Sequence, residues 1–182
     1  MSYSENIFDT SKHAKYKTGN PISRALLRGF YSKIGNAVDE IQFSSLIDIG
    51  CGEGFLLNTL KSKILDKECY AIDLDPAEIV DAKRNLPFCN VAVGSVYELE
   101  FDDDQLDLVI CTEVFEHLDR PEKALEEIHR ITKKYALISV PREPLWRILN
   151  MIRGKYWRDL GNTPGHLNHW SSIEFKKFIS QK

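Results

Sequence analysis

The sequence predicts an α/β fold in which helices are wound on both faces of a parallel sheet. Short apolar runs alternate with segments whose apolar residues recur every three or four positions. The apolar runs are residues 46–49, 69–72, 90–93, 106–111 and 135–140. A strand that is followed by a helix returns to a parallel neighbour through a right-handed crossover. Because each run is almost continuously apolar, both faces of the sheet should be covered, which makes it doubly wound.

Helix signals stand between these strands. Amphipathic spacing runs over residues 21–41, which open with a proline, and over residues 55–64. Asp75 precedes a proline and a glutamate, so it should cap a helix, and another helix should cover residues 121–131. Residues 171–174 read Ser-Ser-Ile-Glu, a capping box for a final helix inside which the sequence stops.

Length and composition limit the class of protein. The 182 residues correspond to one domain, with 43% hydrophobic and 28% charged residues, as in a globular protein. The formal net charge of -3 argues against indiscriminate binding to nucleic acid. No run approaches the ~20 apolar residues of a membrane span, and the first 20 residues lack the apolar core of a signal peptide. We therefore expect a cytoplasmic protein without a membrane partner, and nucleic acid as an unfavoured partner.

The chain divides into parts that belong to one domain, residues 1–182. Residues 1–20 form a polar arm, and residues 21–140 carry the alternating strands and helices. Residues 142–169 break this rhythm with several glycines, prolines and tryptophans, and residues 170–182 begin the last helix.

The four cysteines are Cys51, Cys69, Cys89 and Cys111. They form no C-x-x-C pair, and each lies in or beside an apolar stretch. We expect small buried side chains that stay reduced, since a zinc site requires closer spacing.

A glycine-rich turn is the strongest local signal. Gly50, Gly52 and Gly54 follow the first apolar run and precede a helix. Glycine tolerates positive φ and lets a ligand lie against the backbone, while the helix start offers unpaired N–H groups. A tight turn that binds no ligand would use the same residues, so the neighbouring residues must distinguish the two interpretations.

Those surroundings favour a cationic nucleoside. The spacing is G-x-G-x-G, whereas pyrophosphate-binding turns have G-x-G-x-x-G. Asp48 stands two residues before the first glycine, where it would repel a pyrophosphate but attract an ammonium group. Asp73 ends the second apolar run, about 20 residues further on, where a carboxylate can accept bonds from ribose hydroxyls. S-adenosylmethionine fits this pattern, and NAD does not, which disfavours a dehydrogenase.

Taken together, these motifs resemble the class I S-adenosylmethionine-dependent methyltransferases, specifically the large group that acts on small molecules. The matching stretches are residues 46–54, 71–76, 93–96, 101–117 and 121–131, so the likeness covers about residues 21–140. It implies a Rossmann-like sheet with strand order 3-2-1-4-5. The family normally adds an antiparallel hairpin as strands 6 and 7, for which no residues remain. We therefore expect a truncated domain or a short relative whose fifth strand is an edge.

The resemblance assigns the cofactor's methionine end to two segments. The residues implied are Asp48, Gly50, Cys51, Gly52, Thr112 and Glu113. The glycine turn should lie against the methionine, with Asp48 near its amino group. Thr112 and Glu113 should border the reacting methyl.

At the nucleoside end, the resemblance gives Asp73 the ribose. Leu74 and Val96 should flank the adenine, and Val96 should also offer its backbone N–H to the ring. Many relatives place aspartate where this chain has Ser95, whose hydroxyl is a weaker acceptor for the adenine amino group. That departure affects the affinity expected for the cofactor.

For catalysis, the sulfonium is already an activated leaving group, so the protein mainly aligns the acceptor and excludes water. A hydroxyl or amine acceptor also needs a base, for which Glu116 and His117 are the nearest candidates. His117 would alternatively only pack or cap at a helix end.

A metal ion is an alternative to a protein base. Glu113, Glu116 and His117 stand at i, i+3 and i+4, and His166 lies further along. This resembles the E-x-x-E-H plus distant histidine of small-RNA 2′-O-methyltransferases and ubiquinone-pathway O-methyltransferases. There a divalent ion binds the acceptor hydroxyls, and imidazole ligands favour Mn, Fe, Co or Zn over Mg. Metal-free relatives carry the same stretch, so we assign no metal ligand from the sequence.

Residues 142–169 occupy the place where relatives build substrate pockets, and they should cover the acceptor. Arginines and large aromatic residues supply bidentate capture of anions and flat apolar walls. They are Arg142, Arg147, Arg153 and Arg158 with Trp146, Tyr156 and Trp157. A surface excursion packed around its own tryptophans would have the same composition. In the N-terminal region, Tyr16, Lys17 and Arg24 are candidates to close over the cofactor.

The function predicted is S-adenosylmethionine-dependent methyl transfer to O or N of a small molecule. The alternative is a cofactor-binding sensor or partner subunit without turnover. The sequence does not specify the acceptor or the oligomeric state.

Overall fold

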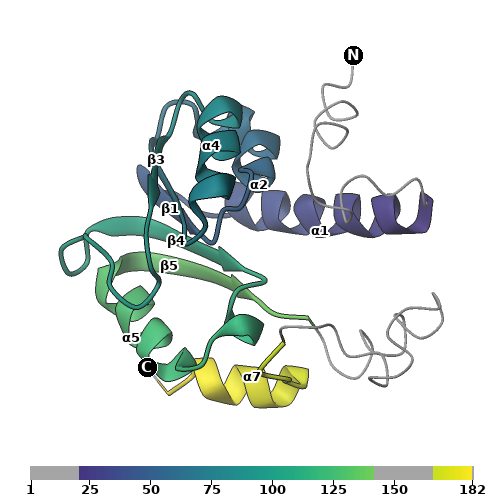
Figure 1. Ribbon diagram of the computed structural model, residues 1–182, viewed down its shortest axis with the longest axis vertical. Helices are drawn as coiled ribbons and strands as arrows, with labels where there is room; N and C mark the ends of the chain where they lie inside the picture. The colour runs from purple at the N-terminus through teal and green to yellow at the C-terminus, as the bar shows by residue number, and fades with distance from the viewer. Residues whose placement is uncertain (1–20, 142–165, 182) are drawn as a thin grey trace.

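A computed structural model describes residues 21–141 and 166–181 (Figure 1). It contains one parallel sheet with strand order β3-β2-β1-β4-β5, which confirms the predicted topology. The strands are β1 (Ser45–Ile49), β2 (Glu68–Asp73), β3 (Asn90–Val93), β4 (Leu106–Thr112) and β5 (Thr132–Ser139).

The two central strands, β1 and β4, are almost entirely buried because helices cover the sheet on both faces. All five residues of β1 are buried, and Leu46 lies opposite Cys69 of β2 and Leu108 of β4. The central strands therefore form the rigid base from which the loops at their carboxyl ends project.

Helices cover the two faces, as Figure 1 shows. One face carries α1 (Pro21–Asp39), α2 (Phe55–Thr59), α3 (Lys61–Ile64) and α4 (Pro76–Asn85). The other carries α5 (Pro121–Ile131) and α7 (Ser172–Ile179). Among the described residues, none of these helices combines the length and the apolar character that crossing a membrane requires.

The predicted helix starts at Asp75 and Ser171 are confirmed. The Asp75 carboxylate accepts a hydrogen bond from the Ala77 backbone N–H at 2.8 Å. Ser171 forms the full capping box with Glu174, whose N–H donates to the serine hydroxyl at 3.3 Å. These caps satisfy backbone donors that would otherwise lack a partner in the first turn.

Several predicted boundaries were wrong. The helix predicted over residues 55–64 is two short helices that meet at Leu60, where φ is -84° and ψ is 0°. The first helix ends at Asp39, and the last ends at Ile179, before the chain does.

Strand β5 begins at Thr132, directly after α5, and not at Tyr135 as predicted. The start was missed because Lys133 and Lys134 are charged and exposed, so they do not belong to the apolar run from which the strand was predicted. Lysine is typical of edge strands, and within the described residues β5 pairs only with β4. The predicted edge position of the fifth strand is therefore confirmed for this part of the chain.

The prediction for the cysteines is wrong for one pair. A disulfide joins Cys69 and Cys89, whose Cα atoms are 4.8 Å apart. The parallel register explains the proximity, since the next residues, Tyr70 and Asn90, face each other across β2 and β3. Cys51 and Cys111 are buried free thiols, as expected.

Candidate functional site

Three loops meet at the carboxyl ends of β1, β2 and β4. Because β2 and β4 lie on opposite sides of β1, this is the point where the winding of the sheet reverses. These regions are residues 50–54 after β1, 73–75 at the end of β2 and 112–117 at the end of β4. They contain most of the residues that the sequence assigned to the cofactor and to catalysis.

Gly50 makes close contact between two of these loops possible. Its φ is +75°, and a Cβ atom at this position would overlap the Val114 side chain from the loop after β4. The N–H groups of Gly50 and Cys51 both donate to the Ile72 carbonyl, at 2.8 and 3.0 Å. A larger residue would therefore push the turn away from the loop after β4.

Gly52 faces more open space. Its φ is +52°, and an added Cβ atom would meet only Glu78 Oε2, at 3.7 Å. Its N–H donates to Asp73 Oδ2 at 2.8 Å. The backbone is thus accessible at the one glycine of the turn where the protein leaves room for a ligand.

The Asp73 carboxylate is fixed by the backbone on both oxygens. Oδ2 accepts from Gly52 and Oδ1 accepts from the Asp75 N–H at 3.0 Å. A carboxylate has about four acceptor positions, so each oxygen can accept a further bond. This arrangement fits a ribose diol, because the acceptors are oriented in advance.

Asp48 lies beneath the turn and is only 2% exposed. Burial, and secondarily the negative charge of Asp73, raises its pKa to about 7. A cationic group nearby would favour its ionised form. The role of Asp48 beside the cofactor's amino group stays a prediction.

The two free thiols at the site are unsuited to be nucleophiles. Burial raises the pKa of both Cys51 and Cys111, and the charge of Asp48 adds to the effect. Both therefore remain protonated near neutral pH.

The adenine-side residues lie on two loops with different exposure. Leu74 is 72% exposed, whereas Val96 is 8% exposed. The Ser95 hydroxyl oxygen accepts a bond from the Tyr97 N–H at 3.3 Å, which leaves one acceptor position for an adenine amino group. Leu74 therefore presents apolar surface, whereas Val96 has little exposed surface, and the assignment of both residues to the adenine stays a prediction.

Glu113 adopts a left-handed conformation with φ of +59° directly after β4. Its N–H donates to the Ser139 carbonyl at 3.1 Å, and its carboxylate accepts from the Ser139 hydroxyl at 3.2 Å. Such a backbone is uncommon in a non-glycine residue, costs of order 1–3 kcal/mol, and is enriched at functional sites. Sequence reasoning missed Ser139, which is distant in sequence and part of the edge strand.

The carboxylate and histidine that were predicted for catalysis lie on a single short turn, η2 (Phe115–His117). Glu116 is buried, His117 is about half exposed, and His117 Nε2 lies 4.0 Å from Glu116 Oε1. Glu113 is not on this turn, because η2 begins only at Phe115, so the i, i+3, i+4 spacing does not bring the three side chains onto one helical turn.

His166 joins these two residues from a distant part of the chain. Ligand atoms of Glu116, His117 and His166 all lie within 4.8 Å of one another, and Glu113 is not part of this group. The two imidazole rings are 5.0 Å apart and nearly perpendicular. Burial, then the neighbouring His117 and His169, lowers the pKa of His166 to about 4, so His166 is neutral at pH 7. One carboxylate and two imidazoles form a donor set that fits a borderline divalent ion.

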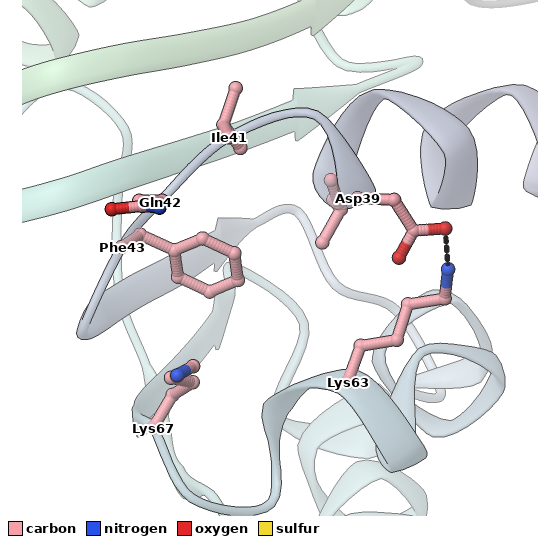
Figure 2. Close-up of a pocket in the computed structure, with 7 residues that line it drawn as sticks. Asp39, Ile41, Gln42, Phe43, Lys63 and Lys67 are labelled. Atoms are coloured by element: carbon pink, nitrogen blue, oxygen red, sulfur yellow. Dashed lines mark hydrogen bonds and ion pairs between the residues drawn. The ribbon is translucent and has the colours of Figure 1, made fainter.

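A separate pocket of about 460 Å³ lies near the amino end of β1, at the end of the strands opposite the three loops (Figure 2). Figure 2 shows the Asp39–Lys63 ion pair on one side and the Phe43 ring on the other. The second lysine in its lining, Lys67, pairs with Asp66 at 3.0 Å. Its cations are thus already paired within the protein, and it lies away from the three loops.

Some predicted residues lie outside the described part of the chain. These are Tyr16, Lys17 and the arginines and aromatic residues between 142 and 165, and for Arg24 only the backbone is described. The interpretation of residues 142–169 as a substrate cover therefore stays a prediction. Within this segment, the structure shows only that residues 166–169 lie beside η2.

Comparison with known proteins gives a consistent result. A family model described as "Methyltransferase domain" matches residues 47–140. The chain is 26% identical over 170 residues to a small RNA 2′-O-methyltransferase of Arabidopsis thaliana, covering 79% of this chain and 18% of that protein. It is 28% identical over 160 residues to a ubiquinone biosynthesis O-methyltransferase of Rickettsia bellii, covering 85% of this chain and 64% of that protein.

Among solved structures, the YcgJ protein from Bacillus subtilis superposes with a TM-score of 0.67 at 19% identity. The match covers 85% of this chain and 67% of that one, and it shows a shared fold. The chain spans less than two thirds of the length of the two curated relatives described above.

Proposed function

The chain belongs to the methyltransferase-domain family, and from this premise we propose that it transfers a methyl group from S-adenosylmethionine to a hydroxyl oxygen of a small molecule. One observation carries the proposal. Glu116 and His117 lie in the loop that follows β4, and His166 joins them there. Val114 of the same loop lies against Gly50 of the glycine turn that would hold the cofactor. A buried carboxylate with two imidazoles is suited to removing the proton of a hydroxyl acceptor.

On the cofactor side, the residues bind and orient. The backbone of Gly52 and the Asp73 carboxylate would face the methionine and the ribose, and Val96 and Leu74 would contact the adenine. When bound, S-adenosylmethionine supplies a methyl group on a sulfonium, which needs no acid to leave. The chain therefore has to align the acceptor oxygen with that methyl and exclude water.

On the acceptor side, His117 is the proposed base. Its side chain is half exposed, so an acceptor hydroxyl can reach it, while buried Glu116 lies 4.0 Å from its Nε2. A carboxylate at this distance stabilises the imidazolium that forms when the proton is taken. His166, neutral at pH 7, would contact the acceptor or His117 without adding a charge.

A hydroxyl acceptor is favoured over an amine by two considerations. Both curated relatives described above are named as O-methyltransferases, one acting on small RNA and one in ubiquinone biosynthesis. The base proposed here also matches a hydroxyl, which must lose a proton to become a good nucleophile. The net charge of -3 favours a small molecule over a polyanion.

A second candidate is metal-assisted transfer, favoured by the spacing of the same three side chains. Glu116, His117 and His166 would hold a divalent ion such as Mn, Fe, Co or Zn. A bound ion would lower the pKa of an acceptor hydroxyl and so replace the protein base.

Transfer of a labelled methyl group tests the proposal. Wild type is incubated with labelled S-adenosylmethionine and with catechols, a small-metabolite extract or a short RNA with a free 2′-hydroxyl. His117→Gln should lower the rate by roughly 10²–10⁴-fold, whereas His129→Gln, which changes an exposed histidine on α5, should not. Transfer to the RNA alone would overturn the acceptor class, and cofactor binding without transfer to any acceptor would support a sensor.

A chelator separates the two candidates for proton removal. Full turnover in the presence of EDTA would exclude the metal and leave His117 as the base. Loss of turnover that added Mn²⁺ restores would instead establish the metal.

A further inference from the structure

We infer that Asn168 is a positioning residue that holds residues 166–168 against η2 and so sets His166 beside His117 and Glu116. This inference deepens the proposed function and rests on it for its link to turnover. No sequence motif pointed to Asn168, and its role emerges only from contacts between segments about 50 residues apart.

The Asn168 side chain spans both ends of η2. Its Nδ2 donates to the Phe115 carbonyl at 3.1 Å and to the Leu118 carbonyl at 2.6 Å. Two carbonyl acceptors can be matched only by the NH₂ group of the amide, so the orientation of the side chain follows from its partners.

The backbone of the same segment adds two bonds to the middle of the turn. The N–H groups of Leu167 and Asn168 both donate to the Glu116 carbonyl, at 2.7 and 3.1 Å. The distant segment thus donates to two carbonyls of η2, those of Phe115 and Glu116, and to that of Leu118 just after it. A short 3₁₀ turn has few internal bonds, so these external donors fix both its shape and its position.

Asn168 stands between the histidine cluster and an aromatic core. Two residues before it, the His166 ring lies 5.0 Å from that of His117. Two residues after it, Trp170 packs on Phe175, with ring centres 5.3 Å apart, and Phe175 in turn lies 6.2 Å from Phe115 of η2. The segment is therefore anchored to η2 by polar bonds at Asn168 and by packing beyond it.

The NH₂ group of Asn168 has no donor left for an acceptor molecule. An amide NH₂ has two donors, and both are used by the carbonyls of Phe115 and Leu118. Asn168 therefore acts through the position of His166.

The test uses Asn168→Asp, which keeps the size of the side chain but replaces both donors with acceptors that face two carbonyls. Asn168→Ser is a milder variant that retains one hydroxyl donor. Ser171→Ala is the matched control, because it removes the cap of α7 without touching the bonds to η2. Each variant is measured for kcat, for the Kd of S-adenosylhomocysteine, and for the ring-to-ring NOE between His117 and His166.

In Asn168→Asp we expect the NOE to disappear and kcat to fall at least tenfold, while Kd stays within twofold of the wild-type value. Asn168→Ser should give values between those of Asn168→Asp and wild type. Ser171→Ala should retain all three values. Wild-type kcat and NOE in Asn168→Asp, or equal losses in Ser171→Ala, would overturn the inference. If Asn168→Asp does not fold, Asn168→Ser decides by the same readouts. If wild type transfers no methyl group, the proposed function fails, and the NOE still decides the role of Asn168.

Discussion

The cofactor side and the acceptor side of the site are built differently. The cofactor side is made by nearby segments, since the bond from Gly52 to Asp73 spans only 21 residues. The acceptor side is closed by Asn168, whose bonds to Phe115 and Leu118 span 53 and 50 residues. Segments close in sequence therefore form the proposed cofactor side, whereas the proposed acceptor side depends on a distant segment.

The two sides also differ in their charged groups. Asp48 and Asp73 give the cofactor side buried or oriented carboxylates, which suit a cationic ligand with a ribose. The acceptor side pairs one buried carboxylate with two imidazoles, which suits proton transfer. If this division holds, substitutions on one side should leave the other side intact.

The largest effect is expected from Gly50→Ala. An alanine must adopt φ of +75° and overlaps Val114, so we expect roughly 3 kcal/mol or more of lost stability together with lost cofactor binding. Gly29→Ala is the control, because an added Cβ atom meets nothing within 4 Å there and the position lies inside α1. It should stabilise the protein by about 0.5–1 kcal/mol. Urea unfolding measures both, and equal stability of the two variants would contradict the geometry of the turn.

Asp73→Ala should cost roughly 2–4 kcal/mol of S-adenosylhomocysteine binding, because charge-assisted bonds to the ribose are lost. Asp75→Ala is the neighbouring control, since its carboxylate caps α4 and should affect stability more than affinity. The NOE between His117 and His166 should survive in both. Unchanged affinity in Asp73→Ala would mean that the ribose is held elsewhere.

The stability of the ligand-free protein should depend on the protonation of Asp48. Burial raises its pKa to about 7 in the folded state, from 3.8 in the unfolded chain, so the folded state binds the proton more tightly. This contribution is fully present below pH 4 and is lost as the pH rises from about 4 to 7. Asp48→Asn should remove that slope and raise stability at pH 8 by a few kcal/mol, since each pH unit between the two pKa values corresponds to about 1.4 kcal/mol. If the stabilities of wild type and Asp48→Asn changed with pH in the same way, the pKa of Asp48 would not be raised in the folded protein.

The smallest effect concerns two bonds that join the loop after β3 to the residues just before α5. Tyr97, next to Val96, donates to Asp119 at 2.6 Å and accepts from the Arg120 N–H at 3.3 Å. Tyr97→Phe should lower the Tm by roughly 2–4 °C, whereas Tyr135→Phe on the exposed strand β5 should not. An identical Tm for both variants would show that this link adds nothing.

Much of the fold follows from local signals in the sequence. Strand β3 begins and ends at the predicted residues, and the caps at Asp75 and Ser171 have the expected bonds. The glycine turn was also recognisable, because positive φ at Gly50 depends on residue type. Such features depend on interactions within a few residues, which sequence patterns report directly.

The features that sequence analysis missed depend on long-range contacts. The disulfide between Cys69 and Cys89 needs the register of two strands, and the partner of Glu113 is Ser139 on another strand. His166 was identified as a candidate, but what holds it in place depends on Asn168, for which no spacing rule exists. The acceptor side was therefore less predictable than the cofactor side, because its residues are held together by contacts between segments that are distant in sequence.

Calorimetric titration of S-adenosylhomocysteine is the most direct test of a cofactor site that is independent of the histidine cluster. Wild type and the double variant His117→Ala/His166→Ala are each titrated with S-adenosylhomocysteine and with NADH. The account predicts equal affinity of both proteins for S-adenosylhomocysteine and no heat with NADH. Binding of NADH, or loss of S-adenosylhomocysteine binding in the double variant, would contradict it.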